Sequence, residues 1–317
     1  MQNSKQSSRR KFLKQLTGTT LALGAGPLAS LAAQEKKEEY ILQYQNYFSS
    51  NDAINVAVIG MGIMGNENAA TAVKVPGVKL VAACDLYTGR LERAKELYGK
   101  DLFVTNDYRK ILARKDVDVV IIATCDQWHA RITKAALQAG KHVYCEKPMV
   151  HYINEGLDVI KVQKASGKVM QVGSQYVSNI VFQKAHELYK SGEIGKLNMV
   201  NAVYDRQDAL GAWEYTMPTD GSTETVDWDR YIEGMKKMPY DPKKFFWWRN
   251  YREFGTGVAG DLFVHLLSGT HVITDSKGPE KIYASGQLCY WKDGRNVPDV
   301  MAGIMQYGET PEHSPFQ

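Results

Sequence analysis

A glycine-rich turn at the end of an apolar run constrains the fold of this chain most. The run Ile54–Ile59 leads directly into Gly60-x-Gly62-x-x-Gly65, and a helical pattern follows. In a strand–turn–helix unit that binds a dinucleotide, the first glycine allows the tight turn and the second lets the backbone approach a pyrophosphate, while the third lets helix and strand pack closely. An ordinary glycine-rich turn can show the same spacing, so the surrounding sequence has to decide.

The surrounding sequence favours the dinucleotide site. A second strand, expected over residues 78–84, places Asp85 twenty residues after the last glycine. A carboxylate there accepts hydrogen bonds from the adenosine ribose and repels a 2′-phosphate, which favours NAD over NADP. The phosphates are expected at the N-terminus of the following helix, where free N–H groups and the helix dipole stabilise an anion, so Ile63 and Met64 join the expected cofactor site.

The first 33 residues have the pattern of an export signal. Arg9 and Arg10 precede a mildly apolar stretch over residues 16–31, and small residues follow. This order predicts a twin-arginine signal over residues 1–33, cleaved near Ala32 or Ala33, and therefore a periplasmic location. An uncleaved anchor stays an alternative, although the stretch is short for a spanning helix and rich in glycine and threonine.

The positive net charge of the chain comes from this signal. The formal net charge is +4, and the five positive residues and no acid in residues 1–33 leave about −1 for the mature chain. We therefore expect no nucleic-acid partner, and no membrane span in the mature chain. Residues 34–52, a charge run followed by tyrosine-rich polar sequence, are expected to form a linker or arm. The cysteines do not pair by spacing and predict free, mostly buried thiols: Cys84, Cys125, Cys145 and Cys289.

From Ile54 onward, expected strands and helices alternate. This alternation predicts a doubly wound parallel sheet, an NAD-binding Rossmann domain over residues 53–173. The expected strands cover residues 54–59, 78–84, 117–123, 142–145 and 169–172, and the expected helices cover residues 88–98, 127–139 and 154–166, with a short helix capped by Asp107.

After residue 173 the pattern changes. A helix is expected over residues 179–191, strands over 197–205, 280–291 and 300–307, and an irregular region rich in Trp, Tyr, Pro and Gly over 207–257. This predicts an α+β domain over residues 174–317 with a mostly antiparallel sheet, acting in substrate binding and oligomerisation. Because the chain stops soon after its last expected strand, we expect a piece of a longer protein.

Loops at the carboxyl ends of parallel strands should border the nicotinamide half of the site. In one of them Lys147 precedes Pro148, which disfavours helix at the lysine. A lysine beside a positive nicotinamide and partly out of water is pushed toward its neutral form and can share a proton with a substrate hydroxyl. The alternative is a surface lysine in a turn. The other residues assigned from these loops are Thr124, Trp128, His129, Glu146 and Tyr176.

Asp261 and His265 are four residues apart and would share one face of a helix. An aspartate beside a histidine can hold the ring and stabilise its charged form, as a general base needs. The alternative is a capping aspartate and a satisfied core histidine. We expect no metal site from these two residues and His271, because no second carboxylate has ligand spacing and hydride transfer needs no metal. The aromatic run over residues 245–251 suits either a sugar ring or the core, and we assign Arg249 and one Trp to the substrate pocket.

Together these motifs resemble the Gfo/Idh/MocA oxidoreductases, named for glucose–fructose oxidoreductase and inositol dehydrogenase. The resemblance implies that Lys147 and His265 form the acid/base pair around a substrate hydroxyl, that Asp261 supports them, and that His129 lies near the nicotinamide. It also implies a large open sheet in the C-terminal domain that forms a homo-oligomer interface. The motifs that carry it are the glycine turn, Asp85, Ala139-Gly140-Lys141-His142-Val143, Cys145-Glu146-Lys147-Pro148-Met149 and Asp261-x-x-x-His265.

Two departures from the family pattern stand out. The family often has Thr-Pro where this chain has Thr124-Cys125, and the chain ends before the family's last strands. The function expected from these motifs is NAD-dependent hydride transfer to or from a secondary alcohol of a sugar, polyol or glycoside, with a cofactor that stays bound after export. A glycoside-cleaving enzyme that works by transient ring oxidation and elimination is one alternative, and a non-catalytic NAD- or sugar-binding protein is another.

Overall fold

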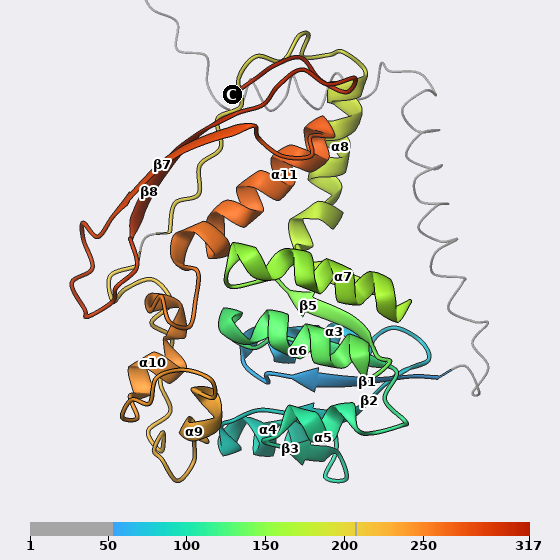
Figure 1. The fold of residues 1–317 in the computed structure, drawn as a ribbon, viewed down its shortest axis with the longest axis vertical. Coiled ribbons are helices and arrows are strands. Elements are labelled where there is room, and N and C mark those ends of the chain that lie inside the picture. Colours follow the sequence, from blue (N-terminus) through green and yellow to red (C-terminus); the bar gives the residue numbers. More distant parts are fainter. Residues whose placement is uncertain (1–52, 207) are drawn as a thin grey trace, which may run out of the picture. The chain divides into compact units, whose positions relative to one another are not determined.

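A six-stranded parallel sheet forms the N-terminal half of the folded chain (Figure 1). Its order is β3-β2-β1-β4-β5-β6, and every neighbouring pair is parallel. The order reverses between β1 and β4, which creates the crevice where open α/β sheets bind ligands. The predicted doubly wound sheet is therefore confirmed. Its strands are β1 Ile54–Ile59, β2 Val78–Cys84, β3 Phe103–Thr105, β4 Val119–Ile122, β5 His142–Glu146 and β6 Met170–Gly173.

The computed structural model describes residues 53–206 and 208–317. The expected export signal and the linker over residues 34–52 lie outside the described residues. Residues 54–74 and 78–317 group into one unit, and the expected domain boundary at residue 173 stays a prediction. No helix in the described part of the chain is long and apolar enough to cross a membrane.

The helices of the parallel half follow the predicted alternation. Asp107 caps its short helix as expected, since its Oδ1 accepts the N–H of Arg109 at 3.1 Å. Cys84, Cys125 and Cys145 are buried free thiols, and Cys289 is an exposed one. The helices are α3 Ile63–Ala72, α4 Thr88–Tyr98, α5 Tyr108–Leu112, α6 Asp126–Gln138 and α7 Gly156–Ser166.

The C-terminal half contains two packed helices and an antiparallel strand pair. Helix α8 (Ile180–Lys190) contacts α11 (Val264–Thr274), and β7 (Lys281–Gln287) pairs with β8 (Val300–Gln306). The antiparallel pairing is confirmed, but the described residues contain no larger antiparallel sheet. Strand β7 is shorter than expected because the carboxylate of Asp299 takes the N–H groups of residues 289–291, at 2.7, 2.7 and 2.8 Å.

The prediction of a strand over residues 197–205 is wrong. These residues form no strand, and their backbone pairs only with the last residue: Val200 N–H donates to the Gln317 carbonyl at 2.9 Å, and Gln317 N–H to that of Asn198 at 3.3 Å. An apolar–polar alternation makes a strand only where a neighbouring strand supplies the hydrogen-bond ladder, and no neighbouring strand among the described residues does so.

The irregular region folds back onto the parallel sheet. We call residues 213–254 the cover segment; it includes the short helices α9 (Trp228–Tyr231) and α10 (Pro242–Phe246). In Figure 1 these helices lie beside the end of the parallel half that carries α4 and β3. Val226 pairs with Tyr87, and Phe254 is fully buried in the same apolar cluster as strand residues of the sheet. The cover segment is thus part of the main core.

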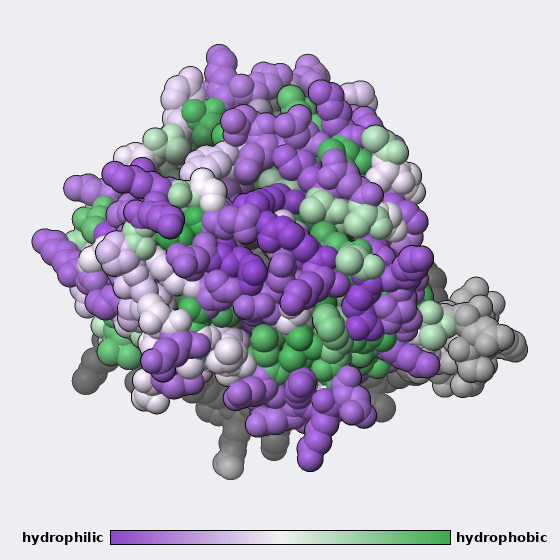
Figure 2. All heavy atoms as spheres, turned by 60° about the horizontal axis from the view of Figure 1, so that its bottom comes forward, coloured by the Kyte–Doolittle hydropathy of each residue, from purple (hydrophilic) through white to green (hydrophobic). Residues whose placement is uncertain are grey.

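The surface at this end is mostly hydrophilic. Figure 2 shows charged and polar residues over most of the face, with apolar residues in patches between them. The large aromatic side chains of the cover segment are mostly buried, including Trp228, Tyr231, Phe245 and Phe254. Burial of this kind is the main stabilising contribution to a packed segment.

Candidate active site

One cavity of about 560 Å³ contains almost all the residues expected in the site. The glycine turn forms one wall, at the switch point of the sheet, and Lys147, Asp261 and His265 form another. Gly65 and His129 are not on its wall. The expected residues that line it are Gly60, Gly62, Ile63, Met64, Asp85, Thr124, Trp128, Glu146, Lys147, Tyr176, Arg249, Asp261 and His265.

Each glycine has the geometry that its expected role requires. Gly60 has φ +94°, and a Cβ there would lie 2.6 Å from the Ala123 carbonyl carbon. A Cβ on Gly65 would lie 1.8 Å from the Gly60 oxygen, so helix and turn are in direct contact. A Cβ on Gly62 would meet only the Arg90 side chain, at 3.9 Å. Gly62 thus leaves an open cradle at the start of α3, where no side chain caps the helix, and a pyrophosphate fits both features.

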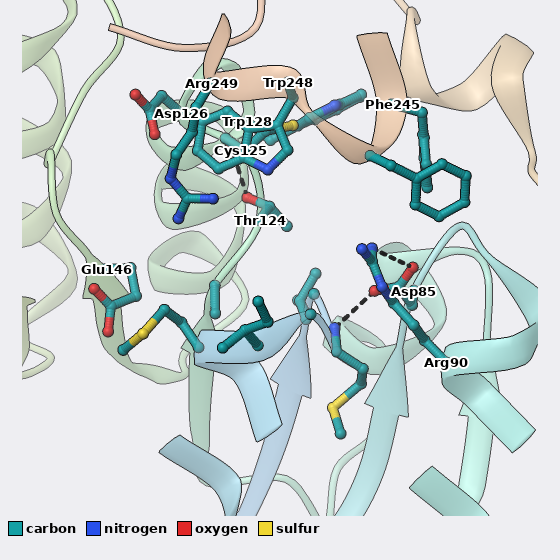
Figure 3. A pocket seen from close by; sticks show the side chains of 18 of the residues that line it. Asp85, Arg90, Thr124, Cys125, Asp126, Trp128, Glu146, Phe245, Trp248 and Arg249 are labelled. Atoms are coloured by element: carbon teal, nitrogen blue, oxygen red, sulfur yellow. Dashed lines mark hydrogen bonds and ion pairs between the residues drawn. The ribbon is translucent and has the colours of Figure 1, made fainter. Parts of the chain in front are cut away.

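Asp85 is held by two backbone donors. Its Oδ2 accepts the N–H of Met61 at 2.7 Å, and its Oδ1 accepts that of Tyr87 at 2.9 Å. The carboxylate therefore ties the end of β2 to the glycine turn and keeps lone pairs for a ribose. Arg90 Nη1 lies 3.4 Å from Oδ1 (Figure 3).

Sequence reasoning missed the neighbours that the cover segment brings to this end. The guanidinium of Arg90 lies 5.7 Å from the ring centroids of both Phe245 and Phe246, and Figure 3 shows Phe245 facing it across the cavity. Arg90 stands close to Asp85 in the sequence and could have been noticed. No local sequence pattern links Phe245 to Arg90, which lies in α4, far away along the chain.

Lys147 is fixed by Asp261. Its Nζ donates to Asp261 Oδ1 at 2.5 Å and to the Asp261 carbonyl at 3.1 Å, and the Lys147–Pro148 peptide is cis. Arg249 Nε also donates to Oδ1, at 3.2 Å. Burial by itself would raise the pKa of Asp261, but Arg249 and Lys147 outweigh it and lower that pKa to about 2. The carboxylate is therefore charged at neutral pH and orients both cations.

His265 is suited to accept a proton. Burial, and then the charge of Lys147, lower its pKa below the ordinary 6.5, and Asp261 raises it by less. The ring is thus neutral at pH 7. Tyr176 packs edge-on against it, with 4.6 Å between ring centroids. His265 Nδ1 is buried without a hydrogen-bond partner among residues 53–206 and 208–317.

The expected Asp261–His265 contact is replaced by the contacts of Asp261 with Lys147 and Arg249. Asp261 lies in a π-helical stretch, Ala259–Phe263, that precedes α11. In a π-helix the hydrogen bonds join residues five apart, so residues four apart no longer lie directly above one another. Such insertions are frequent at functional sites. Asp261 supports the lysine directly and reaches the histidine only through its charge.

His129 lies behind the cavity wall. Its Nδ1 is 2.6 Å from the Pro148 carbonyl oxygen and its Nε2 is 3.2 Å from that of Thr124. Both neighbours are acceptors, so the two ring nitrogens both donate when the ring is charged. Burial alone would lower the pKa of His129, but Cys145, Asp126 and the Pro148 carbonyl outweigh burial and raise that pKa. The residue joins the loops after β4 and β5, one of which carries Lys147.

The substrate side of the cavity is built largely by distant segments. Arg249 lies on the wall as expected, with its guanidinium 4.2 Å from the Trp248 ring centroid. Sequence reasoning did not assign Tyr204, Arg206, Trp213 or Tyr215, which also line the cavity. In the described residues no three His, Cys, Asp or Glu side chains group as metal ligands, and His271 instead contacts the Tyr307 hydroxyl at 2.9 Å.

Comparison with known proteins also indicates a dinucleotide-binding domain in the N-terminal half of the folded chain. Residues 54–174 match the model of an oxidoreductase family with an NAD-binding Rossmann fold, Gfo/Idh/MocA. Inositol 2-dehydrogenase of Salmonella paratyphi B is 34% identical over 150 residues, which cover 47% of this chain and 45% of that protein. A glycosyl hydrolase family 109 protein of Shewanella is 33% identical over 157 residues, 47% of this chain and 32% of that protein.

The chain thus spans less than half the length of these curated relatives. A solved NAD-binding protein from Listeria innocua shares the fold over 83% of this chain and 66% of its own, with a TM-score of 0.58 and 22% identity. Residues 54–174, which include the glycine turn, Asp85 and Lys147, are thus similar to the NAD-binding Rossmann domain of the Gfo/Idh/MocA oxidoreductases.

Proposed function

We propose that this protein is an NAD-dependent oxidoreductase that acts on a secondary alcohol of a sugar, polyol or glycoside. The observation that carries the proposal is the placement of the Lys147 amine and the neutral His265 ring on the wall of the cavity that also holds the glycine turn. The match to inositol 2-dehydrogenases supports a carbohydrate-like alcohol as substrate.

The chain's own residues would hold the cofactor and move the proton. The turn at Gly62 and the start of α3 would bind the pyrophosphate, and Asp85 the adenosine ribose, which favours NAD over NADP. When bound, the nicotinamide supplies the hydride acceptor. In the oxidation direction His265 takes the hydroxyl proton, while Lys147, oriented by Asp261, donates a hydrogen bond to the same oxygen and stabilises its developing negative charge.

We also propose that the protein is exported with its cofactor and retains it. The twin-arginine pattern at Arg9 and Arg10 supports export. The cover segment supports retention: the Tyr87 hydroxyl donates to Asp220 at 2.6 Å, and Trp128 Nε1 donates to the Tyr231 carbonyl at 3.1 Å. A dinucleotide whose adenosine half lies beneath a packed segment leaves slowly, because exit requires local unfolding. Protein purified from the periplasm should still contain dinucleotide after dialysis; empty protein would refute retention.

Hydride transfer is tested by offering sugars, polyols and aryl glycosides to the protein with its native cofactor and following reduced-nicotinamide fluorescence. A lasting rise with one alcohol class supports the dehydrogenase. The match to a glycosyl hydrolase family 109 protein favours a second candidate, glycoside cleavage through transient oxidation. Release of the aryl alcohol with no lasting change in fluorescence would identify it. If no compound changes the nicotinamide fluorescence and no aryl glycoside releases its aryl alcohol, the protein is a non-catalytic binding protein.

We further propose a homo-oligomer formed through the C-terminal strands. All seven residues of β7 are exposed, including Ile282 and Tyr283. Light scattering of the purified protein tests this, and a monomer at micromolar concentration would contradict it.

A further inference from the structure

The substrate side of the cavity contains an arginine that the proposed mechanism does not use. Arg206 Nη2 donates to the Tyr215 hydroxyl at 3.1 Å, and its guanidinium lies 5.8 Å from the centroid of the Trp213 ring. Both neighbours also line the cavity. The guanidinium is thus within cation–π range of one aromatic side chain and hydrogen-bonded to another, which limits the side-chain entropy it would lose on binding a ligand.

Arg206 lines the same cavity as the reacting groups, and two residues near it contact the segment that carries them. Tyr204, two residues earlier, stacks on the His265 ring with 6.4 Å between centroids. Trp213 packs in one apolar cluster with Leu262, the residue after Asp261. A ligand whose alcohol lies between Lys147 and His265 therefore extends toward Arg206 within the same cavity.

Arg206 differs from the other cations of the cavity in having no carboxylate partner. Five positively charged side chains in the described part of the chain line the cavity, and four of them form ion pairs. The pairs are Arg90 with Asp85, Lys147 with Asp261, Arg249 with Asp261, and Arg230 with Asp227. Within residues 53–206 and 208–317 no ion pair involves Arg206, so most of its N–H donors remain available to a ligand.

Trp213, the aromatic neighbour of Arg206, has a strained backbone conformation. Trp213 has φ +66°, a conformation that bulky residues rarely adopt, and among described non-glycine residues only Asp275 shares a positive φ. The buried guanidinium of Arg295 holds this turn: Nη2 donates to the Ala212 carbonyl at 3.4 Å and to Asp293 at 2.5 Å. Strain held in place by a buried ion pair at a cavity wall indicates a functional position.

We propose that Arg206 binds an acidic group of the substrate, so that the substrate is a sugar or polyol carrying a carboxylate or a phosphate. A guanidinium binds either group through two parallel hydrogen bonds. Trp213 and Tyr215 position the Arg206 guanidinium, and the alcohol of the bound substrate reaches Lys147 and His265. The inference rests on the proposed dehydrogenase and names its substrate class.

The experiment compares glucose, glucuronate and glucose 6-phosphate with the full chain and its native dinucleotide. Binding is measured by calorimetry, and turnover by nicotinamide fluorescence. We expect one acidic sugar to bind at least about tenfold more tightly than glucose, as for a hydrogen bond to a charged group, and we expect this preference to weaken at high salt. Tighter binding of glucuronate would identify a carboxylate site, and tighter binding of glucose 6-phosphate would identify a phosphate site.

Arg206→Met should abolish the preference for the acidic sugar, and Arg206→Lys should restore part of it. Arg93→Met, the same change on the exposed surface of α4, should leave the preference intact. Arg206 is exposed, so these variants should keep the thermal midpoint of the parent. Equal affinity for all three sugars, or a preference that Arg206→Met does not alter, overturns the inference while leaving the dehydrogenase intact. Arg206-dependent binding without any hydride transfer contradicts the dehydrogenase instead.

Discussion

Replacement of Asp261 by Asn tests the centre of the proposed site. Asp261 and Lys147 side chains are 13% and 10% exposed, and the Lys147–Asp261 contact is 2.5 Å. Asn keeps the shape and removes the charge that pairs with two cations. We expect Lys147 to lose its fixed position and turnover to fall by about two orders of magnitude, as when a general acid–base group is lost.

The stability effect follows from the pKa of Asp261. Its lowering from 3.8 to about 2 corresponds to about 2 kcal/mol of folding free energy at pH 7. Because the folded-state pKa is depressed, this contribution is fully present above the unfolded pKa and is lost as the pH falls toward 2. By the same relation it is about half as large at pH 3.

The assay is urea unfolding of the parent and Asp261→Asn between pH 7 and pH 3. The difference in unfolding free energy should be near 2 kcal/mol and constant above about pH 5, then shrink below pH 4. Glu96→Gln, which removes a solvent-exposed ion pair with Arg93, is the control and should change stability by less than about 1 kcal/mol. A pH-independent difference, or a variant as stable as the parent, would refute the reasoning.

Three further predictions concern single residues of the site. Lys147→Ala should lower turnover by about two or more orders of magnitude and leave the dinucleotide bound; unchanged turnover in a steady-state assay would remove the lysine from the mechanism. Because burial and Lys147 lower the pKa of His265 below 6.5, kcat/KM for alcohol oxidation should stay level down to about pH 6.5 and fall below it as the base is protonated; a pH profile that already falls above pH 7 would contradict the role of His265. Gly65→Ala forces a Cβ to within 1.8 Å of the Gly60 oxygen and should destabilise the fold by about 1–3 kcal/mol and weaken dinucleotide binding. Gly156→Ala, whose Cβ would meet Met149 at 3.6 Å, is its control in thermal unfolding, and equal midpoints would argue against close packing at Gly65.

Short-range patterns predicted the parallel half well. Apolar runs set β1 and β2 at their expected residues, and the glycine spacing led to the turn where Gly60 has a positive φ. Such features depend on neighbours within a few residues, because turn chemistry and side-chain alternation are local properties. The prediction of a strand over residues 197–205 was wrong because strand pairing depends on a partner elsewhere in the chain, which a local pattern does not reveal.

The sequence by itself determined the Rossmann domain, the glycine turn, the position of Asp85 and the presence of Lys147 at a strand end. Only the tertiary structure decided which charges meet: Asp261 pairs with Lys147 and Arg249 rather than with His265, His129 joins two loops behind the wall, and Arg206 has no acidic partner among the described residues. Partner choice depends on how distant segments pack. The cover segment and the π-helical stretch before α11 bring side chains together at separations along the chain that no periodic pattern records.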